Sequence, residues 1–463
     1  MINIKLCIQK FVLPWILLFY VTNCILFKES DLDPDSSLLE TLFTLRIIQY
    51  ASISISPSPA HYISPQYITM TAASGTKIYF TVDGTEPNTS SNEYSEPIHI
   101  WKLAGAQITA VAIKDGFNLA RASQLDYYSY PILKTGKTQC FDQNGNGIAC
   151  VNSGQDGEYK NGVARNFTGP IANSKFPNDF ITTDEATGII WKSCTQGQSG
   201  ANCTSSSIIQ DWNSAQTGPN GCSSLNSANA GEGFAGRKDW RLPKIDELRT
   251  LIDYSGQNLN NTIPRTFVSA FPNTPSGAGN IGTFWTITQS VSGFFPFNVS
   301  FSSTLTDFNS ITPASLLNVR CVAGFPSLRS FRYTDNGNLT VIDHKTRMSW
   351  QKCTNNQTGS NCTGTAGLFL WDNATSFCNS LSLNSQKWRL PSANELEDFF
   401  NFTRFDANPR VDLTVFPNTP ASQGYWSSTT STELPDFKIS ILTNGNYSSI
   451  GGSNNGSLRC VSN

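Results

Sequence analysis

One stretch of this 463-residue chain occurs twice, and it decides the fold. The first copy is Asp-Trp-Arg-Leu-Pro-Lys-Ile-Asp-Glu-Leu-Arg at residues 239–249, and the second is Lys-Trp-Arg-Leu-Pro-Ser-Ala-Asn-Glu-Leu-Glu at residues 387–397. Each copy predicts a strand end that turns through Leu-Pro into a helix, because proline is favoured where helices begin. A glutamate follows in the first helical turn, where the helix dipole stabilises negative charge.

The two helix starts differ in their caps. Ser392 and Glu395 form a capping-box pattern in the second copy, whereas Lys244 replaces the serine in the first copy and predicts a weaker cap. Glu247 and Glu395 are therefore expected to cap helices rather than to act as general acids or bases. Apolar residues follow at the spacing of a helix packed on a core: Leu248, Leu251 and Ile252, and then Leu396, Phe399 and Phe400.

The motif lies inside a longer repeat that covers residues 178–325 and 329–463. Phe-Pro-Asn-Thr-Pro at 271–275 recurs at 416–420, and Val-Arg-Cys-Val at 319–322 recurs as Leu-Arg-Cys-Val at 458–461. Order and spacing hold throughout, so two copies of one domain are expected. The matching arginines (Arg241 and Arg389, Arg320 and Arg459) are predicted to pair with buried carboxylates. The matching tryptophans are expected mostly in the core, with one pair left as an alternative sugar-stacking surface: Trp191 and Trp350, Trp212 and Trp371, Trp240 and Trp388, Trp285 and Trp426.

The amino terminus has the pattern of an export signal. Lys5 and Lys10 precede an apolar run at 11–21, which is too short to span a bilayer and has the length of a signal-peptide core. The run ends in Val-Thr-Asn-Cys at 21–24, which resembles the lipobox of bacterial lipoproteins, although Asn23 stands where Gly or Ala is usual.

The lipobox resemblance implies that residues 1–23 are a signal peptide and that Cys24 receives a diacylglycerol. Simple signal cleavage and an uncleaved anchor are the alternatives. Residues 24–54 would then be a tether, with a short helix at 38–48. The expected location is the cell envelope, anchored by lipid, with the outer membrane as partner and the protein exposed at the surface.

Composition limits the kinds of partner and chemistry. The net charge is −2 and only 14% of residues are charged, which argues against nucleic acid because phosphate binding needs clustered Lys and Arg. The three histidines lie in different modules without spaced partners, so we expect no metal centre, no cofactor and no catalytic residues. Asp142 to Gly147 matches half of a calcium loop, but Ser153 stands where a bidentate carboxylate is needed, so a tight turn is favoured over calcium binding.

Ten cysteines follow Cys24, an even number, and pairing is expected in an oxidising compartment. Four cysteines per repeat allow three connectivities, and we favour closing the short loop first. The cysteine of the first helix would then pair with the one in the last strand, which closes a loop of about 100 residues and stabilises by up to roughly 4.7 kcal/mol in the chain-entropy model. The favoured pairs are Cys140–Cys150, Cys194–Cys203, Cys222–Cys321, Cys353–Cys362 and Cys378–Cys460.

A different module precedes the repeats. Residues 67–70, 77–82 and 107–113 alternate apolar and polar side chains as half-buried strands do. The run Ile-Tyr-Phe-Thr-Val-Asp-Gly-Thr-Glu-Pro at 78–87 resembles the small β-sandwich appended to chitobiases and β-hexosaminidases. The resemblance covers 55–126 and implies an immunoglobulin-like spacer or binding module. Residues 127–177 are a connector rich in Gly and Asn.

Each repeat resembles the Lcl C-terminal domain family, on the Trp-Arg-Leu-Pro motif, Phe-Pro-Asn-Thr-Pro and the closing Arg-Cys-Val. The family resemblance implies a bacterial extracellular module, C-type-lectin-like in fold, with adhesion as its function and sulfated glycosaminoglycans as one ligand class. A basic cluster around the first motif is a candidate for such a ligand (Arg237, Lys238, Arg241, Lys244 and Arg249).

The expected fold is multidomain and mainly β, with an immunoglobulin-like sandwich followed by two tandem C-type-lectin-like α+β domains. The expected function is extracellular binding or adhesion to a glycan or matrix ligand. A structural envelope component without a soluble ligand is the alternative, followed by a formylglycine-generating type of enzyme. We expect the ligand to contact loops that differ between the copies, such as 215–237 and 276–284.

Overall fold

The computed structural model describes residues 4–9, 22–27, 52–62, 66–103, 106–114, 116–124, 128–129, 132–255, 266–277, 280–289, 295–301, 308–328, 333–401, 408–421, 423–431, 437–442, 447–451 and 454–463. Near the amino terminus, β1 (Ile4–Gln9) pairs antiparallel with β2 (Thr22–Phe27). The predicted signal core at 11–21 and the predicted helix at 38–48 lie outside the described residues. Among the helices that are described, none is long and apolar enough to cross a membrane.

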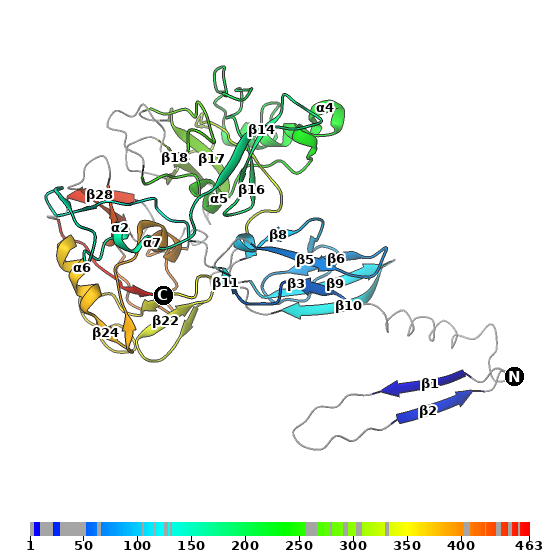
Figure 1. Ribbon diagram of the computed structural model, residues 1–463, viewed down its shortest axis with the longest axis horizontal. Helices are drawn as coiled ribbons and strands as arrows, with labels where there is room; N and C mark the ends of the chain where they lie inside the picture. The colour runs from blue at the N-terminus through cyan, green and yellow to red at the C-terminus, as the bar shows by residue number, and fades with distance from the viewer. Residues whose placement is uncertain are drawn as a thin grey trace.

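The first folded module is a β-sandwich at the blue end of the chain (Figure 1). One sheet has the order β10-β9-β6-β7 and the other the order β3-β5-β8, while a short parallel pair joins β4 to β11. The strands are β3 (Ser54–Ser56), β4 (His61–Tyr62), β5 (Tyr67–Thr71), β6 (Lys77–Thr81), β7 (Asn92–Glu93), β8 (Ile98–His99), β9 (Ile108–Lys114), β10 (Phe117–Gln124) and β11 (Tyr128–Ser129), with the 3₁₀ helix η2 (Ile100–Leu103) after β8. The predicted strands at 67–70, 77–82 and 107–113 correspond to β5, β6 and β9.

The sandwich core is built from the alternating side chains of these strands. Ile68, Phe80 and Ile108 are fully buried in it, and Phe325 from the segment between the repeats packs against the same cluster. The ring of Phe325 lies 5.4 Å from that of Phe80. The sandwich therefore packs on the repeat region through this apolar contact, besides being linked to it by the chain.

The connector is short on regular structure. It contains β12 (Cys140–Phe141), β13 (Gly147–Ile148) and the single-turn helix α2 (Asp156–Tyr159). The Asp142 carboxylate accepts hydrogen bonds from the backbone N–H groups of Asn144 and Asn146 at 2.9 and 2.8 Å, and from the Asn146 side chain at 2.9 Å. These hydrogen bonds form a tight turn, which is the structure predicted for this segment in preference to a calcium loop.

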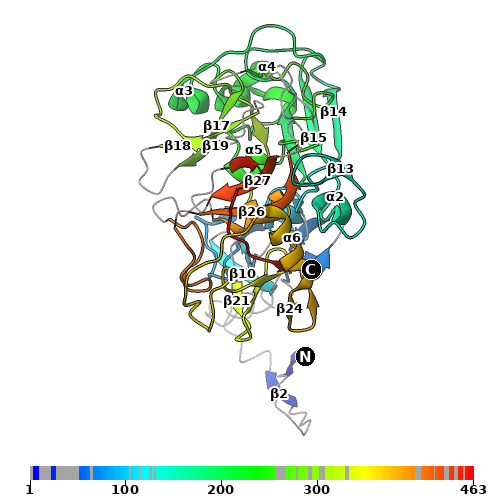
Figure 2. The same ribbon diagram turned by 90° about the vertical axis from the view of Figure 1, so that its left-hand side faces the viewer.

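The connector packs on the second repeat, although the first repeat follows it in sequence (Figure 2). Lys438 Nζ donates to the carbonyl of Asp142 at 2.8 Å, and Tyr159 Oη donates to Asn379 at 3.1 Å. The Tyr159 ring also lies over the Arg389 guanidinium, 5.6 Å from centroid to carbon. The connector thus lies on the surface of the second repeat, although it precedes the first repeat in sequence.

Each repeat combines two antiparallel sheets with short helices. In the first repeat the sheets have the orders β14-β15-β16-β20 and β17-β18-β19, and in the second β21-β22-β23-β29 and β26-β27-β28, with the hairpin β24-β25 beside them. The first repeat contains β14 (Phe167–Ala172), β15 (Phe180–Asp184), β16 (Ile189–Lys192), α3 (Trp212–Thr217), η3 (Cys222–Ser227), α4 (Ala228–Gly231), η4 (Phe234–Gly236), α5 (Ile245–Arg249), β17 (Thr283–Gln289), β18 (Pro296–Ser300), β19 (Phe308–Ser310) and β20 (Val322–Ala323). The second contains β21 (Tyr333–Asp335), β22 (Thr340–Asp343), β23 (Ser349–Gln351), α6 (Trp371–Ser380), β24 (Ser382–Leu383), β25 (Gln386–Lys387), α7 (Ala393–Phe399), β26 (Gly424–Thr430), β27 (Phe437–Leu442), β28 (Tyr447–Gly451) and β29 (Val461–Ser462).

The last strand of each repeat pairs with an early strand of the same repeat, β20 with β16 and β29 with β23. One apolar cluster runs through both repeats and includes Trp191 and Leu248 from the first and Trp350 and Leu396 from the second. Seven of the eight repeat tryptophans are buried, and Trp212 is partly exposed, so they belong to the core as expected. The predicted fold class is confirmed: the chain is mainly β, and a β domain precedes two copies of one module.

The ten cysteines form five disulfides, which agree with the pairs favoured from spacing: Cys140–Cys150, Cys194–Cys203, Cys222–Cys321, Cys353–Cys362 and Cys378–Cys460. The two long-range bonds lie in the smaller core of each repeat. Cys222 and Cys321 pack with Trp240 and Trp285. The equivalent bond of the second repeat packs with Trp388 and Trp426.

Candidate functional site

The arginine and glutamate of each repeated motif form a buried ion pair. Arg241 binds Glu247 through two hydrogen bonds of 2.7 and 2.8 Å, and Arg389 binds Glu395 through two of 2.6 and 2.7 Å. Both glutamates are fully buried and also accept a backbone N–H at the start of the helix. Although burial opposes ionisation, Arg241 lowers the pKa of Glu247. Both carboxylates cap the first turn of their helices, which is the role expected for them.

The two helices differ at the residue before their first turn. The Ser392 hydroxyl accepts the backbone N–H of Glu395 at 3.3 Å. Lys244 has no side-chain acceptor to do the same, and its Nζ instead donates to the carbonyl of Ser327 at 2.5 Å. The predicted weaker cap is therefore present in the first repeat, and Lys244 is directed toward the segment between the repeats.

The prediction that Arg320 and Arg459 pair with carboxylates is wrong. Arg320 is 1% exposed, and its guanidinium donates to the carbonyl of Ser193 and, at 2.7 Å, to the hydroxyl of Thr274. It also lies over the Phe271 ring, 4.8 Å from centroid to carbon. Burial lowers the pKa of Arg320 to about 9. Neutral oxygens and aromatic faces take the place of an acid, and Arg459 has the equivalent neighbours in the second repeat.

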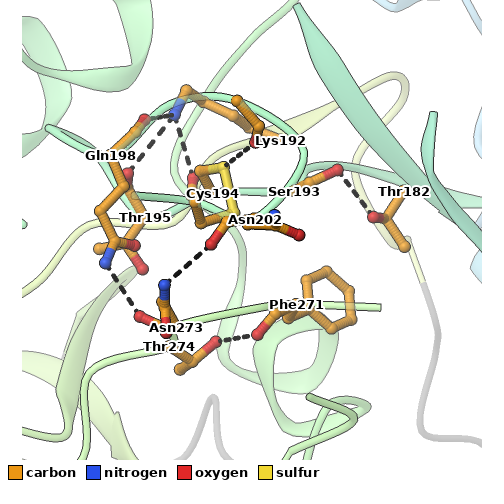
Figure 3. Close-up of a disulfide and its surroundings, with 12 residues drawn as sticks. Thr182, Lys192, Ser193, Cys194, Thr195, Gln198, Asn202, Phe271, Asn273 and Thr274 are labelled. Carbon is orange, nitrogen blue, oxygen red and sulfur yellow. Dashed lines mark hydrogen bonds between the residues drawn. A yellow bond between two sulfur atoms is a disulfide. The ribbon is translucent and has the colours of Figure 1, made fainter. Parts of the chain in front are cut away.

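The short disulfide loop and Phe-Pro-Asn-Thr-Pro hold each other in place (Figure 3). Asn273 donates to the carbonyl of Asn202 at 2.9 Å, and Gln198 donates to the carbonyl of Asn273 at 2.9 Å. Lys192 Nζ lies inside the loop and donates to three of its carbonyls, at 3.1 to 3.4 Å. Burial, with a smaller effect of Arg320, lowers the pKa of Lys192 to about 7. The hydrogen bonds of this cluster join the loop to Phe-Pro-Asn-Thr-Pro and serve the fold, while Gln198 Oε1 is buried without a partner among the described residues.

A cleft of about 310 Å³ lies where the two motif helices approach each other. Its lining comes from the sandwich, the connector and both repeats. An apolar wall is formed by Trp101, Ile132, Leu133, Ile245, Ile287 and Phe400. The polar groups that face it from the first repeat and the following segment are Lys244, Asp246, Thr250, Thr288 and Ser327, while Asn394 faces it from the second. Binding sites are typically concave, apolar in part and equipped with a few convergent polar groups.

Ion pairs form the charged floor of the cleft. Arg249 of α5 pairs with Glu397 of α7, and Lys345 pairs with Asp398 at 2.5 Å. Arg249 and Glu397 occupy the same position in the two copies of the motif. Because their charges are opposite, their ion pair joins the two repeats. These four groups are paired within the protein. The other charged side chains that line the cleft are Arg165, Lys244 and Asp246.

Sequence reasoning did not find this cleft. The loops 215–237 and 276–284, which are expected to contact the ligand, do not line this cleft with any of their described residues, and that expectation stays a prediction. The predicted basic cluster is largely compensated, since Arg237 pairs with Glu96 and Asp239, Arg241 with Glu247, and Arg249 with Glu397. The one sequence signal for the cleft was Lys244, which departs from the serine of the second copy.

Comparison with known proteins agrees with the motifs. The Lcl C-terminal domain matches residues 180–323 and again residues 339–462, more than half of the chain. The chitobiase/beta-hexosaminidase C-terminal domain matches residues 57–123. No curated protein matches the chain. Together the two matches indicate a modular protein of the extracellular, carbohydrate-related kind.

Proposed function

Because the chain belongs to the Lcl C-terminal domain family, we propose that it is an extracellular binding protein that attaches to a glycan or a glycan-bearing matrix. The tandem repeats are the binding unit, and the β-sandwich is the spacer that presents them. The observation that carries the proposal is the cleft between the motif helices, because it is the place where both repeats, the connector and the sandwich contribute to one concave surface.

The lining of the cleft suits a sugar ring. A sugar presents an apolar C–H face and a set of hydroxyl groups, and the cleft offers an apolar wall opposite the polar groups of Asp246, Thr288 and Asn394. Its volume of about 310 Å³ is near the lower end for small-molecule sites, which fits one or two sugar units rather than a long chain segment.

The proposed role is binding without turnover. Glu247 and Glu395, the carboxylates of the repeated motif, are fully buried in ion pairs and do not line the cleft. All ten described cysteines beyond Cys24 are in disulfides, so the reactive thiol pair of a formylglycine-generating enzyme has no counterpart among them. Both observations support binding over catalysis.

The experiment is an array of glycans and matrix proteins probed with the full-length oxidised protein. Binding is expected to be retained after Ile209→Trp, since Ile209 is 49% exposed and does not line the cleft. The same enlargement at the cleft, Ile287→Trp, is expected to remove binding by filling the space. Absence of any bound glycan or matrix protein would reject the proposal in favour of a structural role in the envelope.

We further propose that the protein is held at the cell envelope by a lipid on Cys24, which the lipobox-like Val-Thr-Asn-Cys supports. The amino-terminal peptide of the mature protein is then expected to begin at Cys24 and to carry a diacylglycerol. Mass spectrometry of that peptide distinguishes this outcome from simple cleavage. Cys24→Ser is expected to move the protein from the membrane fraction to the soluble fraction.

A further inference from the structure

The two repeats use one equivalent hydroxyl in different ways. Thr288 and Thr429 occupy matching positions on β17 and β26, because each accepts the first backbone N–H of its motif helix, from Ile245 at 3.0 Å and from Ala393 at 2.9 Å. Each hydroxyl therefore keeps its own hydrogen for a second partner. The acceptor of this second hydrogen bond differs between the two repeats.

In the second repeat the partner is a carboxylate of the connector. Thr429 donates to Asp156 at 2.7 Å, and Thr135 donates to the same carboxylate at 2.5 Å. Asp156 is 3% exposed, so this side chain is enclosed by protein. Burial raises the pKa of Asp156, although the two threonine hydroxyls and Lys137 act in the opposite direction. The position beside Thr429 is thus a carboxylate site that the chain fills by itself.

In the first repeat the matching position is open. Thr288 is half-buried and lines the cleft, and its hydroxyl has no acceptor among the residues that the structure describes. The Ser327 hydroxyl also lines the cleft, is 2% exposed and has no hydrogen-bond partner within the described part of the chain. Neither hydroxyl is hydrogen-bonded to a carboxylate within the described residues. The carboxylates that also line the cleft are Asp246 and the ion-paired Glu397 and Asp398.

Lys244 supplies the positive charge that a carboxylate would need. A lysine is a poor residue for the start of a helix, because it lacks the capping oxygen of serine and its charge opposes the helix dipole. Its presence weakens the helix cap, while its Nζ binds the Ser327 carbonyl instead, and departures of this kind from the favoured residue mark functional positions. The ammonium lines the cleft and is bound there only to the neutral carbonyl of Ser327 in the described structure.

We propose that the cleft binds the carboxylate of a sugar acid, in the place on the first repeat that Asp156 occupies on the second. Thr288 and Ser327 donate hydrogen bonds to the carboxylate, Lys244 balances its charge, and Asp246 accepts hydroxyls of the ring. This ligand class rests on the proposed glycan-binding function. The apolar wall of Trp101, Ile132 and Phe400 favours a sugar ring over an acidic peptide side chain.

The test is a titration of the full-length oxidised protein with glucuronate, glucose and glucose 6-sulfate, followed by NMR. Glucuronate is expected to bind at least about tenfold more tightly than glucose, since hydrogen bonds to a charged group are worth more than neutral ones. Lys244→Ser and Thr288→Val are each expected to weaken glucuronate binding about tenfold. Lys238→Ser, at an exposed lysine outside the cleft, is the matched control and is expected to change nothing.

Lys244→Ser also separates binding from folding. It restores the cap found in the second repeat, so its melting temperature is expected to equal or exceed that of the unchanged protein. Failure of glucuronate to bind, equal affinity for glucose 6-sulfate, or full affinity in Lys244→Ser would overturn the carboxylate site. If neutral glycans still bind on the array in those cases, the proposed function stands and only this inference falls. A glutamate-containing peptide that displaces glucuronate at equal concentration would also overturn it.

Discussion

Asp184 and Asp343 are single residues with a predictable effect on stability. They occupy matching turns in the two repeats, are 1% and 3% exposed, and accept hydrogen bonds from Thr187 and Thr346 at 2.7 and 2.8 Å. Burial raises the pKa of each aspartate to about 6 from an ordinary value of 3.8. The folded protein therefore binds more protons than the unfolded chain between these pH values.

The stability that these aspartates contribute is present below about pH 3.8 and is lost as pH rises through about 6. Replacing both by Asn is expected to reduce the difference in unfolding free energy between pH 4 and pH 7 by roughly 2 kcal/mol per site. Urea unfolding at the two pH values measures it, with Asp253→Asn in a more exposed turn as control. An unchanged pH dependence in the double variant would contradict the raised pKa values.

The partners of the motif arginines, Arg241 and Arg389, could be predicted from the sequence. The partners of Arg320 and Arg459 could not. Arg241 is six residues from Glu247, so a local pattern places acid and base together. Arg320 has its partners at Ser193 and Thr274, far away in sequence. Both partners are neutral. No local sequence pattern predicts that a guanidinium will bind carbonyls, hydroxyls and aromatic rings in place of a carboxylate.

The long-range disulfides are expected to stabilise the protein more than the short-range ones. Cys222 and Cys321 are 99 residues apart, whereas Cys194 and Cys203 are 9 apart. In the chain-entropy model the long loop contributes roughly 4.7 kcal/mol and the short one roughly 2.7 kcal/mol. Replacing the long-range pair by alanines is therefore expected to lower the urea midpoint more than replacing the short-range pair. The reverse order would show that the short loop acts through its contacts with Phe-Pro-Asn-Thr-Pro.

The motif helices were predicted in place but not in length. Helix α5 ends at Arg249, although the apolar pattern continues to Leu251 and Ile252, which are buried beyond the helix end. Periodicity predicts which side chains enter the core, and it does so here even where the backbone leaves the helix. The cleft was beyond such reasoning, because it exists only after the two helices have docked against each other.

For the whole molecule, the pair of Arg249 and Glu397 joins the repeats. Arg249→Glu or Glu397→Arg alone places like charges together in a buried contact and is expected to destabilise by about 3–5 kcal/mol, as breaking buried pairs does. The double exchange restores opposite charges and is expected to recover most of the loss. Thermal unfolding of the three variants measures this coupling. Additive losses in the double variant would mean that the repeats are held together by apolar contacts alone.

The docking of the connector on the second repeat bears on how the protein is made. A nascent chain grows from its amino end, so residues 132–161 emerge long before Lys438 and Thr429, the side chains that bind them. The connector can make these contacts only after the second repeat has been synthesised. A chain truncated before the second repeat would lack these contacts, and its connector is expected to be cleaved by proteases more readily than that of the full chain.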